Sequence, residues 1–394
     1  MRVLCTCVPG YGHLHPMVPL ALALRDAGHE VAFATEERFC PRVGRAGFRA
    51  FPAGIGPGKV LERTLARPDV PAPGPEHAWR FGAQMFAAVA APAKVPDLVD
   101  VISTWAPHLV IHDVTDFAGP VAAAHAALPY AAHSLGPMFP MEFSLVGTEL
   151  VAPLWKEWGV TPGPLGGMFG SAYLDICPPS LQSADLDRIP PVARPLRAVP
   201  FDAVDGEALP AWVDDLPSQP TVYVTLGTLD NDAPGVIEAA VEGLRGEPVN
   251  VIVTVGPNRD PAELGPQPAN VHVERYVPQS LLLARCDAVV AHGGSGTTLA
   301  ALGLGLPLVI LPQGANQFWN AERCAALGAG VRLLPDEVSA AAVRGAVRVV
   351  LDDPSYRERA GGLAAEIAAM PAPADVVPLL ESLAAGRTAD PQKG

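Results

Sequence analysis

The sequence is poor in positive charge. Its 394 residues include 27 Lys and Arg against 41 Asp and Glu, which gives a formal net charge of −14 at pH 7. Nucleic acids and anionic membranes attract basic protein surfaces, because binding releases counterions from phosphates or pairs cations with lipid headgroups. The charge balance therefore argues against a nucleic acid or a membrane as a partner. An anionic nucleotide has to be held by local groups such as helix termini.

Long hydrophobic runs and cysteine motifs are also missing. No stretch of 18 or more apolar residues occurs, so length excludes a membrane-spanning helix. The apolar run at residues 1–8 is too short for the core of a signal peptide and leads directly into a glycine turn. The six cysteines form neither a Cys-x-x-Cys pair nor a Cys/His metal spacing, so we interpret them as reduced structural thiols. These features favour a cytoplasmic protein.

The first part of the chain alternates strand and helix patterns. We expect strands at residues 3–8, 30–34, 48–51, 109–113 and 130–133, with helices between them. This alternation predicts an α/β fold with a parallel, doubly wound sheet. Residues 54–80 are rich in Gly and Pro without a clear period, and we expect a long loop there.

A second series of strands and helices begins after a stretch rich in Pro and acidic residues. We therefore expect two Rossmann-like domains facing each other across a cleft, with ligands bound at the carboxyl ends of their strands. The predicted boundaries are 1–200 for the N-terminal domain, 201–220 for a linker, 221–374 for the C-terminal domain, and 375–394 for a last helix and a frayed tail.

The most informative stretch runs from Asp287 to Arg323. A buried strand at 288–291 ends at His292, a glycine turn follows, and a helix begins near Thr297. Glycines let the backbone approach a ligand closely, while the free N–H groups and the dipole of the helix attract negative charge. The pattern predicts a diphosphate site. A dinucleotide-binding glycine motif is a weak alternative, because Leu299 stands where the third glycine belongs.

The segment HGGSGTTLAALGLGLPLVILPQGANQFWNAER resembles the C-terminal signature of the family 1 nucleotide-sugar glycosyltransferases. The resemblance is strongest to the bacterial enzymes that attach deoxysugars to natural products such as antibiotics. Matching positions keep one register through His292, the Gly-x-Gly-Thr turn, Gly305-x-Pro307, Pro312, Gln317 and Asn320-Ala321-x-Arg323. The resemblance implies the twin-domain GT-B fold, in which the last helix packs back on the N-terminal domain.

The resemblance also implies a set of donor-binding residues. The diphosphate is expected to contact His292, the N–H groups of Gly294, Ser295, Gly296 and Thr297, the Thr297 hydroxyl, and the pair Gly227-Thr228. The segment Tyr276-Val277-Pro278-Gln279 resembles the one that receives the nucleobase, although an ordinary core tyrosine is the alternative for Tyr276. Asn316 and Gln317 stand where relatives bind the sugar.

His13 and Asp113 are the candidate catalytic residues. His13 follows the first expected strand and Asp113 ends the fourth, and these strands are neighbours in the common order 3-2-1-4-5. A histidine there can accept a proton from a hydroxyl, and a carboxylate on its far nitrogen fixes the tautomer. Asp116 is the rival carboxylate. The block Gly12-His13-Leu14-His15-Pro16 also resembles the segment of the family that bears the catalytic base, with His15 interpreted as structural.

Two positions depart from the family pattern. Ala300 stands where plant relatives carry a glutamate that binds the ribose hydroxyls, which favours a thymidine over a uridine nucleotide. Asn316 stands where most relatives have Asp; because an amide both donates and accepts hydrogen bonds, an unusual or less hydroxylated sugar is expected.

A lipophilic aglycone is the expected acceptor. Apolar and aromatic side chains adapt to flat apolar ligands, although each of these residues could equally be core. The candidate acceptor-binding residues are Trp79, Met85, Ser134, Met138, Phe139 and Phe143.

No Asp-x-Asp motif lies at an expected strand end, so we expect neither a metal nor another cofactor. Inversion at the anomeric carbon is implied by the family alone. Two other functions remain open, a nucleotide-sugar 2-epimerase of the same fold and a non-catalytic partner of another transferase. The sequence also leaves open a homodimer and transfer to carbon or nitrogen.

Overall fold

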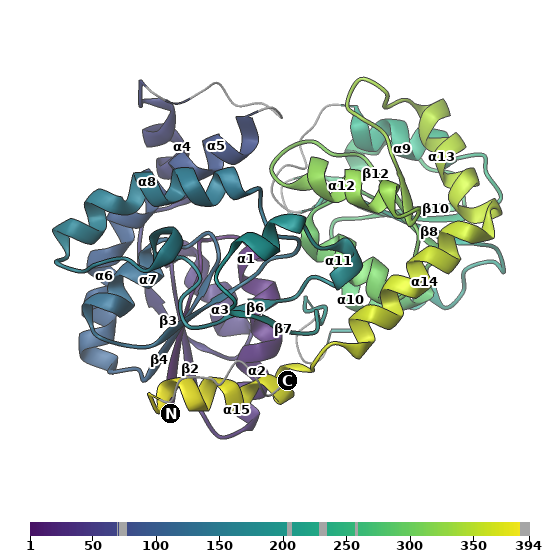
Figure 1. Cartoon of the computed structure of the whole chain (residues 1–394). Helices are drawn as coiled ribbons and strands as arrows, with labels where there is room; N and C mark the ends of the chain where they lie inside the picture. Colours follow the sequence, from purple (N-terminus) through teal and green to yellow (C-terminus); the bar gives the residue numbers. More distant parts are fainter. Residues whose placement is uncertain (69, 71–76, 203–206, 228–234, 257–258, 387–394) are drawn as a thin grey trace. The chain divides into compact units, whose positions relative to one another are not determined.

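The computed structural model describes residues 1–68, 70, 77–202, 207–227, 235–256 and 259–386. The chain forms two compact units. Unit 1 consists of Met1–Cys177, Gln182–Arg197 and Met370–Gly394, and unit 2 consists of Pro178–Leu181 and Ala198–Ala369. Figure 1 labels the helices and strands of both units.

Unit 1 is built on a seven-stranded sheet in which each neighbouring pair is parallel, in the order β3-β2-β1-β4-β5-β6-β7. The strands are β1 Arg2–Thr6, β2 Glu30–Thr35, β3 Arg49–Pro52, β4 Leu109–Asp113, β5 Tyr130–His133, β6 Tyr173–Asp175 and β7 Ala193–Pro195. The first five have the predicted order 3-2-1-4-5. The predicted doubly wound α/β fold is therefore confirmed for this unit.

The central strands β1 and β4 place the first candidate residues. Both strands are almost fully buried, as expected where helices cover both faces of a parallel sheet. Their register sets Thr6 opposite His112, so the turn after β1 and the end of β4 lie at the same edge. This edge brings helix α1, Tyr11–Leu14, close to Asp113.

Unit 1 also contains several α-helices and a π-helix. They are α1, α2 Val18–Asp26, α3 Cys40–Arg45, α4 Pro57–Leu65, α5 Ala78–Ala83, the π-helix η4 Gln84–Ala90, α6 Ala91–Trp105, α7 Ala118–His125, α8 Met141–Glu157 and α15 Pro373–Ala384.

Unit 1 contains three local features that the sequence did not indicate. Helix α4 occupies part of the expected loop at 54–80; it buries Val60 and Thr64, while its other apolar side chains are largely exposed. The three-residue strands β6 and β7 were not predicted, because such short segments show no period. Helix α6 continues through Pro96, although proline lacks the N–H group that a helical hydrogen bond needs.

Unit 2 contains a six-stranded sheet, again with parallel neighbours, in the order β10-β9-β8-β11-β12-β13. Its strands are β8 Thr221–Thr225, β9 Asn250–Thr254, β10 Val271–Glu274, β11 Ala288–Ala291, β12 Leu308–Ile310 and β13 Gly330–Arg332. Its helices are α9 Val236–Leu244, α10 Gln279–Leu282, α11 Ser295–Gly303, α12 Gln317–Ala326, α13 Ala340–Asp352 and α14 Pro354–Ala369. This confirms the second Rossmann-like domain.

The last helix, α15, belongs to unit 1. It packs beside α2 (Figure 1) and buries four apolar side chains, Val376, Val377, Leu380 and Leu383. Of the helices in the described part of the chain, none alone is long and apolar enough to cross a bilayer, and only α14 and α15, bent by 42°, reach that limit as a pair.

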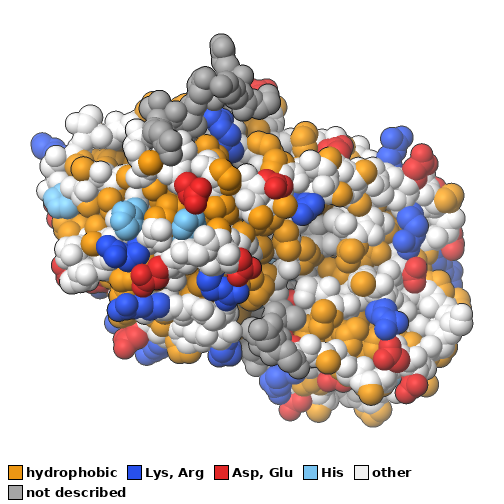
Figure 2. Space-filling model, turned by 90° about the horizontal axis from the view of Figure 1, so that it is seen from below, with side chains coloured by type: hydrophobic (Ala, Val, Ile, Leu, Met, Phe, Trp, Pro, Cys, Tyr) orange, Lys and Arg blue, Asp and Glu red, His pale blue; other side chains and the backbone are white. Residues whose placement is uncertain are grey.

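Part of the expected linker is packed against unit 2. Trp212 stacks on His272 of β10 with nearly parallel rings, 4.3 Å between centroids. Elsewhere on the surface, basic and acidic side chains are interspersed on the face shown in Figure 2, with hydrophobic atoms between them.

Candidate active site

Three side chains of unit 1 meet at the edge of β1 and β4. The Nδ1 atom of His13 lies 3.4 Å from Oδ1 of Asp113 and 3.2 Å from Oγ1 of Thr115. His13 comes from α1, whereas Asp113 and Thr115 come from the end of β4 and the turn after it. The predicted neighbourhood of His13 and Asp113 is therefore present in the structure, and Thr115 is an additional member that the sequence analysis missed.

Asp113 is a fully buried carboxylate with several donors. Oδ2 accepts a hydrogen bond from the N–H of Val8 at 2.8 Å, and Oδ1 accepts from both the N–H and the hydroxyl of Thr115, at 2.7 and 2.5 Å. Burial alone would raise the pKa of this carboxyl, but His13 and these donors hold the pKa at about 2. Asp113 is therefore ionised at neutral pH.

The rival carboxylate, Asp116, has a different partner. Its Oδ2 lies 2.6 Å from Nζ of Lys94 and accepts a hydrogen bond from the Thr6 hydroxyl at 2.6 Å. Lys94 also donates to the carbonyl of Cys7 at 2.8 Å and is almost fully buried. This ion pair occupies Asp116, so Asp113 is the carboxylate beside His13. Nothing in the sequence around Lys94 signals this contact.

The candidate acceptor residues fall into two groups. Met138 and Phe143 belong to the hydrophobic core of unit 1, while Trp79 and Phe139 are half-buried against it. Met85 is also half-buried, in η4. From the same π-helix, Phe86 lies edge-on to the ring of His13, with centroids 6.0 Å apart. Phe86 is thus an aromatic neighbour of the candidate base.

Ser134 contacts the segment that follows β6. It is fully buried, and its hydroxyl oxygen accepts a hydrogen bond from the N–H of Ile176 at 2.8 Å and lies 3.4 Å from Asp175. The Asp175 carboxylate also accepts from the Gln182 side chain, whose oxygen in turn accepts from the N–H of Met138. The hydroxyl of Ser134 therefore supports the loop that carries Met138.

In unit 2, His292 follows β11 and fits between two glycines. A Cβ on Gly227 or on Gly294 would overlap its ring, and Gly227 has a φ of +78° that favours glycine. Burial lowers the pKa of His292 to about 4, so the imidazole is neutral near pH 7. Its Nδ1 atom is buried and has no hydrogen-bond partner among the described residues. A neutral ring of this kind can bind an anion through an N–H group.

The N-terminus of α11 lies directly after this histidine. Its first hydrogen bond runs from the N–H of Thr298 to the carbonyl of Gly294. In the described part of the chain, no acceptor engages the N–H groups of Ser295, Gly296 or Thr297. These donors and the helix dipole suit a phosphate group, as the glycine turn predicts.

The expected sugar-binding residues are also tied to this turn. Asn316 donates to the hydroxyl oxygen of Ser295 at 2.9 Å, and buried Asn320 donates to the same oxygen at 3.1 Å and to the carbonyl of Gly293 at 2.8 Å. The side-chain oxygen of Gln317 accepts from the N–H groups of Gln313 and Gly314. The amides therefore fix the shape of the loops around the glycine turn.

The expected nucleobase segment precedes α10. Tyr276 is 52% exposed, which excludes the alternative of a core tyrosine, and its hydroxyl donates to the carbonyl of Asp202 at 3.0 Å. Burial of its hydroxyl end and the nearby acidic groups Asp202 and Glu207 raise the pKa of Tyr276. Val277 is buried, and the Gln279 side chain accepts from the Thr297 hydroxyl at 3.0 Å, which links α10 to α11.

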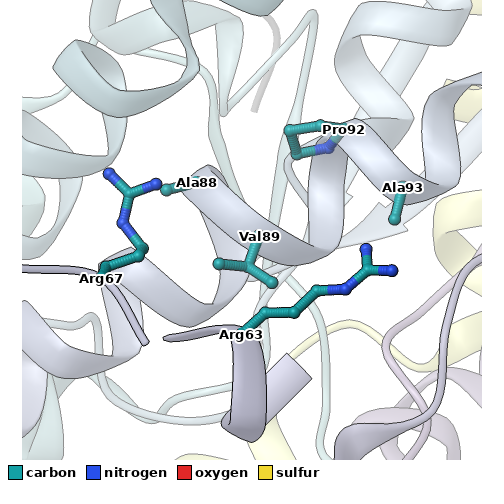
Figure 3. Close-up of a pocket in the computed structure, with 6 residues that line it drawn as sticks. All are labelled: Arg63, Arg67, Ala88, Val89, Pro92 and Ala93. Atoms are coloured by element: carbon teal, nitrogen blue, oxygen red, sulfur yellow. The ribbon is translucent and has the colours of Figure 1, made fainter. Parts of the chain in front are cut away.

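Thr228, an expected phosphate contact, lies outside the described residues. A shallow hollow of about 390 Å³ in unit 1 is lined by none of the candidate residues; Figure 3 shows its lining by Arg63, Arg67, Ala88, Val89, Pro92 and Ala93. Where the structure describes the chain, no three His, Cys, Asp or Glu side chains are grouped as metal ligands.

Known proteins match the chain over nearly its whole length. Family models described as the N-terminal and C-terminal domains of erythromycin biosynthesis protein CIII-like proteins match residues 74–227 and 244–383. The L-demethylnoviosyl transferase of Streptomyces niveus is 36% identical, over 98% of each chain.

Solved structures of glycosyltransferases are also similar to the chain over nearly its whole length. The glycosyltransferase SnogD from Streptomyces nogalater is 33% identical with a TM-score of 0.78, covering 98% of this chain and 99% of that one. A spinosyn rhamnosyltransferase in complex with thymidine diphosphate is 30% identical with a TM-score of 0.81, covering 97% of this chain and all of the other. The same enzyme is also known with the spinosyn aglycone bound. The chain thus belongs to the erythromycin biosynthesis protein CIII-like family and is a glycosyltransferase of natural-product deoxysugar pathways.

Proposed function

We propose that the enzyme transfers a sugar from a thymidine diphosphate sugar to a hydroxyl group of a lipophilic aglycone, with inversion and without a metal ion. The contact of His13 with Asp113 and Thr115 carries this proposal. It occupies Nδ1 of the imidazole on the protein side, which leaves Nε2 as the atom that receives a proton.

The reaction is a single displacement. The acceptor hydroxyl gives its proton to Nε2 of His13 while its oxygen attacks the anomeric carbon of the donor. The bond from that carbon to the diphosphate oxygen breaks, and the diphosphate leaves with the electron pair. Attack opposite the leaving group inverts the anomeric configuration. The imidazolium that forms is stabilised by the ionised Asp113.

Leaving-group stabilisation falls to unit 2. The N–H groups of Ser295, Gly296 and Thr297 and the N-terminal end of the α11 dipole are fixed donors for the diphosphate charge. His292 adds a neutral donor beside them. Such preorganised donors stabilise developing negative charge without reorganisation, which is the role that a metal ion fills in other transferases.

Two observations support a thymidine nucleotide. The rhamnosyltransferase of the same fold was solved with thymidine diphosphate. Ala300, in α11, is buried and carries no polar group for a ribose hydroxyl. A donor without a 2′-hydroxyl loses nothing at this position.

The test combines catalysis with binding. We expect His13→Ala to lose transfer by about 10²–10⁴-fold, because it removes the general base, while the Kd for thymidine diphosphate stays within twofold. Mass spectrometry of products and isothermal titration calorimetry measure the two quantities. Normal turnover of His13→Ala contradicts the mechanism.

The donor and the reaction class need a separate experiment. A matrix of thymidine and uridine diphosphate sugars against a panel of aglycones, analysed by mass spectrometry, identifies the pair that reacts. Reactions with donor alone serve as the control. Accumulation of an isomeric donor without acceptor indicates a 2-epimerase, and no product in any combination indicates a non-catalytic partner.

A further inference from the structure

The hydroxyl of Thr115 lies between the candidate base and its carboxylate. It is 2.5 Å from Oδ1 of Asp113 and 3.2 Å from Nδ1 of His13, whereas the direct distance from Nδ1 to Oδ1 is 3.4 Å. The hydroxyl is therefore the nearer of the two partners of the imidazole. Its residue is 1% exposed, so water does not compete for these contacts.

The hydroxyl of Thr115 has to donate its hydrogen to Asp113. A hydroxyl has a single hydrogen and can accept two further hydrogen bonds. An ionised carboxylate only accepts, so Asp113 can share the 2.5 Å contact only if Thr115 donates. The oxygen of Thr115 then presents a lone pair to His13, and Nδ1 of His13 has to carry the proton.

We propose that Thr115 is a positioning residue that selects the tautomer of His13 protonated on Nδ1 and so leaves Nε2 free to accept the proton of the acceptor hydroxyl. The inference rests on the proposed function, because a free Nε2 matters only if His13 is the base. Thr115 touches no substrate atom in this scheme. It acts through the imidazole.

The surrounding backbone fixes Thr115 in place. Its own N–H donates to the same oxygen of Asp113 at 2.7 Å, and its carbonyl accepts from the N–H of Phe117 at 3.2 Å. The second oxygen of Asp113 is held from the other side by Val8 at 2.8 Å. The carboxylate cannot turn away without breaking these bonds, and the hydroxyl cannot turn away without losing its own 2.5 Å bond to Asp113, so the imidazole meets a rigid acceptor.

The experiment uses two substitutions of the full-length enzyme. Thr115→Val replaces the hydroxyl by a methyl group of similar size, and Thr115→Ser keeps the hydroxyl. We expect kcat of Thr115→Val to fall about ten- to a hundredfold with the KM for the nucleotide sugar unchanged, and Thr115→Ser to recover most of the loss. A purely structural role predicts loss of Tm in both variants and no such split between kcat and KM.

A spectroscopic readout tests the tautomer without catalysis. Long-range ¹H–¹⁵N NMR of the ligand-free enzyme distinguishes a protonated Nδ1 from a protonated Nε2, and His13→Ala identifies the signals. We expect the wild type and Thr115→Ser to show neutral His13 protonated on Nδ1, and Thr115→Val to show a mixture. If Thr115→Val does not fold, Thr115→Ala takes its place in both measurements.

The two proposals fail in different ways. An unchanged tautomer in the folded variant that lacks the hydroxyl overturns the role of Thr115, whatever its activity. Unchanged kcat together with an inactive His13→Ala also overturns it, while His13 remains the base. Full activity of His13→Ala overturns the proposed function itself.

Discussion

At the scale of single residues, two buried carboxylates lie within four positions of each other and have separate partners. Asp113 faces His13, and Asp116 faces Lys94. The sequence placed both carboxylates at a strand end but could not assign them, because Lys94 lies in a helix about twenty positions away. Only the folded chain distinguishes the carboxylate beside the base from the one in the ion pair.

The Lys94–Asp116 pair gives a stability prediction. Lys94→Met leaves a buried carboxylate without its cation, and breaking such pairs costs about 3–5 kcal/mol. Thermal or chemical unfolding measures the loss. Arg285→Met, which breaks an exposed pair with Asp214, is the control and should change stability little. An equal loss of stability in the two variants would show that the buried ion pair stabilises the protein no more than the exposed one.

At the scale of elements, a glycine allows helix α8 to lie close to the ring of Phe117. Gly147 lies in the middle of α8, and a Cβ there would overlap the ring of Phe117. Gly345 lies in the middle of α13 with open space around it. A glycine-to-alanine substitution therefore meets a packed ring in α8 and open space in α13.

These two glycines form a matched pair. Gly345→Ala should stabilise the protein by about 0.5–1 kcal/mol, because alanine has the better helix propensity. Gly147→Ala should destabilise it by about 1–3 kcal/mol, because the ring of Phe117 has to move within a packed core. Urea denaturation measures the free energy of unfolding of both variants. A stabilised Gly147→Ala contradicts the packing described for α8.

Asp175, the last residue of β6, gives a prediction of pH dependence. Burial raises its pKa from 3.8 to about 6. A carboxyl with a raised pKa binds its proton more tightly in the folded state, so its contribution to stability is complete below about pH 4 and is lost as the pH rises through 6. The size of the shift corresponds to about 3 kcal/mol.

Asp175→Asn removes this titration. Between pH 4 and 6 the free energy of unfolding of the wild type should fall relative to that of Asp175→Asn, measured by chemical denaturation at a series of pH values. A constant difference between the two proteins across this range contradicts the raised pKa.

The elements that could be predicted from sequence share a physical property. Strands such as β4 and β8 are apolar runs buried on both faces, and their pattern depends only on their own residues. Helix α4 has exposed Leu61 and Leu65 beside buried Val60, so its apolar pattern does not indicate which face is covered. Strands β6 and β7 form by pairing with the edge of the sheet beyond β5. Three residues are too few to show this pairing in the sequence.

At the scale of the whole molecule, unit 1 is assembled from three separate stretches of chain. Helix α15 follows all of unit 2 in sequence, yet it packs against α2 of unit 1 and buries apolar side chains. The backbone also joins the stretches directly, because the N–H of Arg197 donates to the carbonyl of Pro371 at 2.7 Å.

This assembly predicts which unit each of two neighbouring helices stabilises. Leu380→Ala in α15 should cost about 2–5 kcal/mol and increase hydrogen exchange in the strands of unit 1. Leu363→Ala in α14, which is also buried, should increase exchange in unit 2. Hydrogen exchange with mass spectrometry resolves the two units, and identical exchange patterns in the two variants would contradict the division.

Synthesis on a ribosome adds a delay to this arrangement. At about 5–20 residues per second, the roughly 170 residues that separate the second and third stretches take on the order of ten to thirty seconds to translate. Throughout that interval the surface of α2 against which α15 packs stays exposed, and chaperones can bind such apolar surface. Unit 1 is therefore completed only when α15 has been synthesised, after the whole of unit 2.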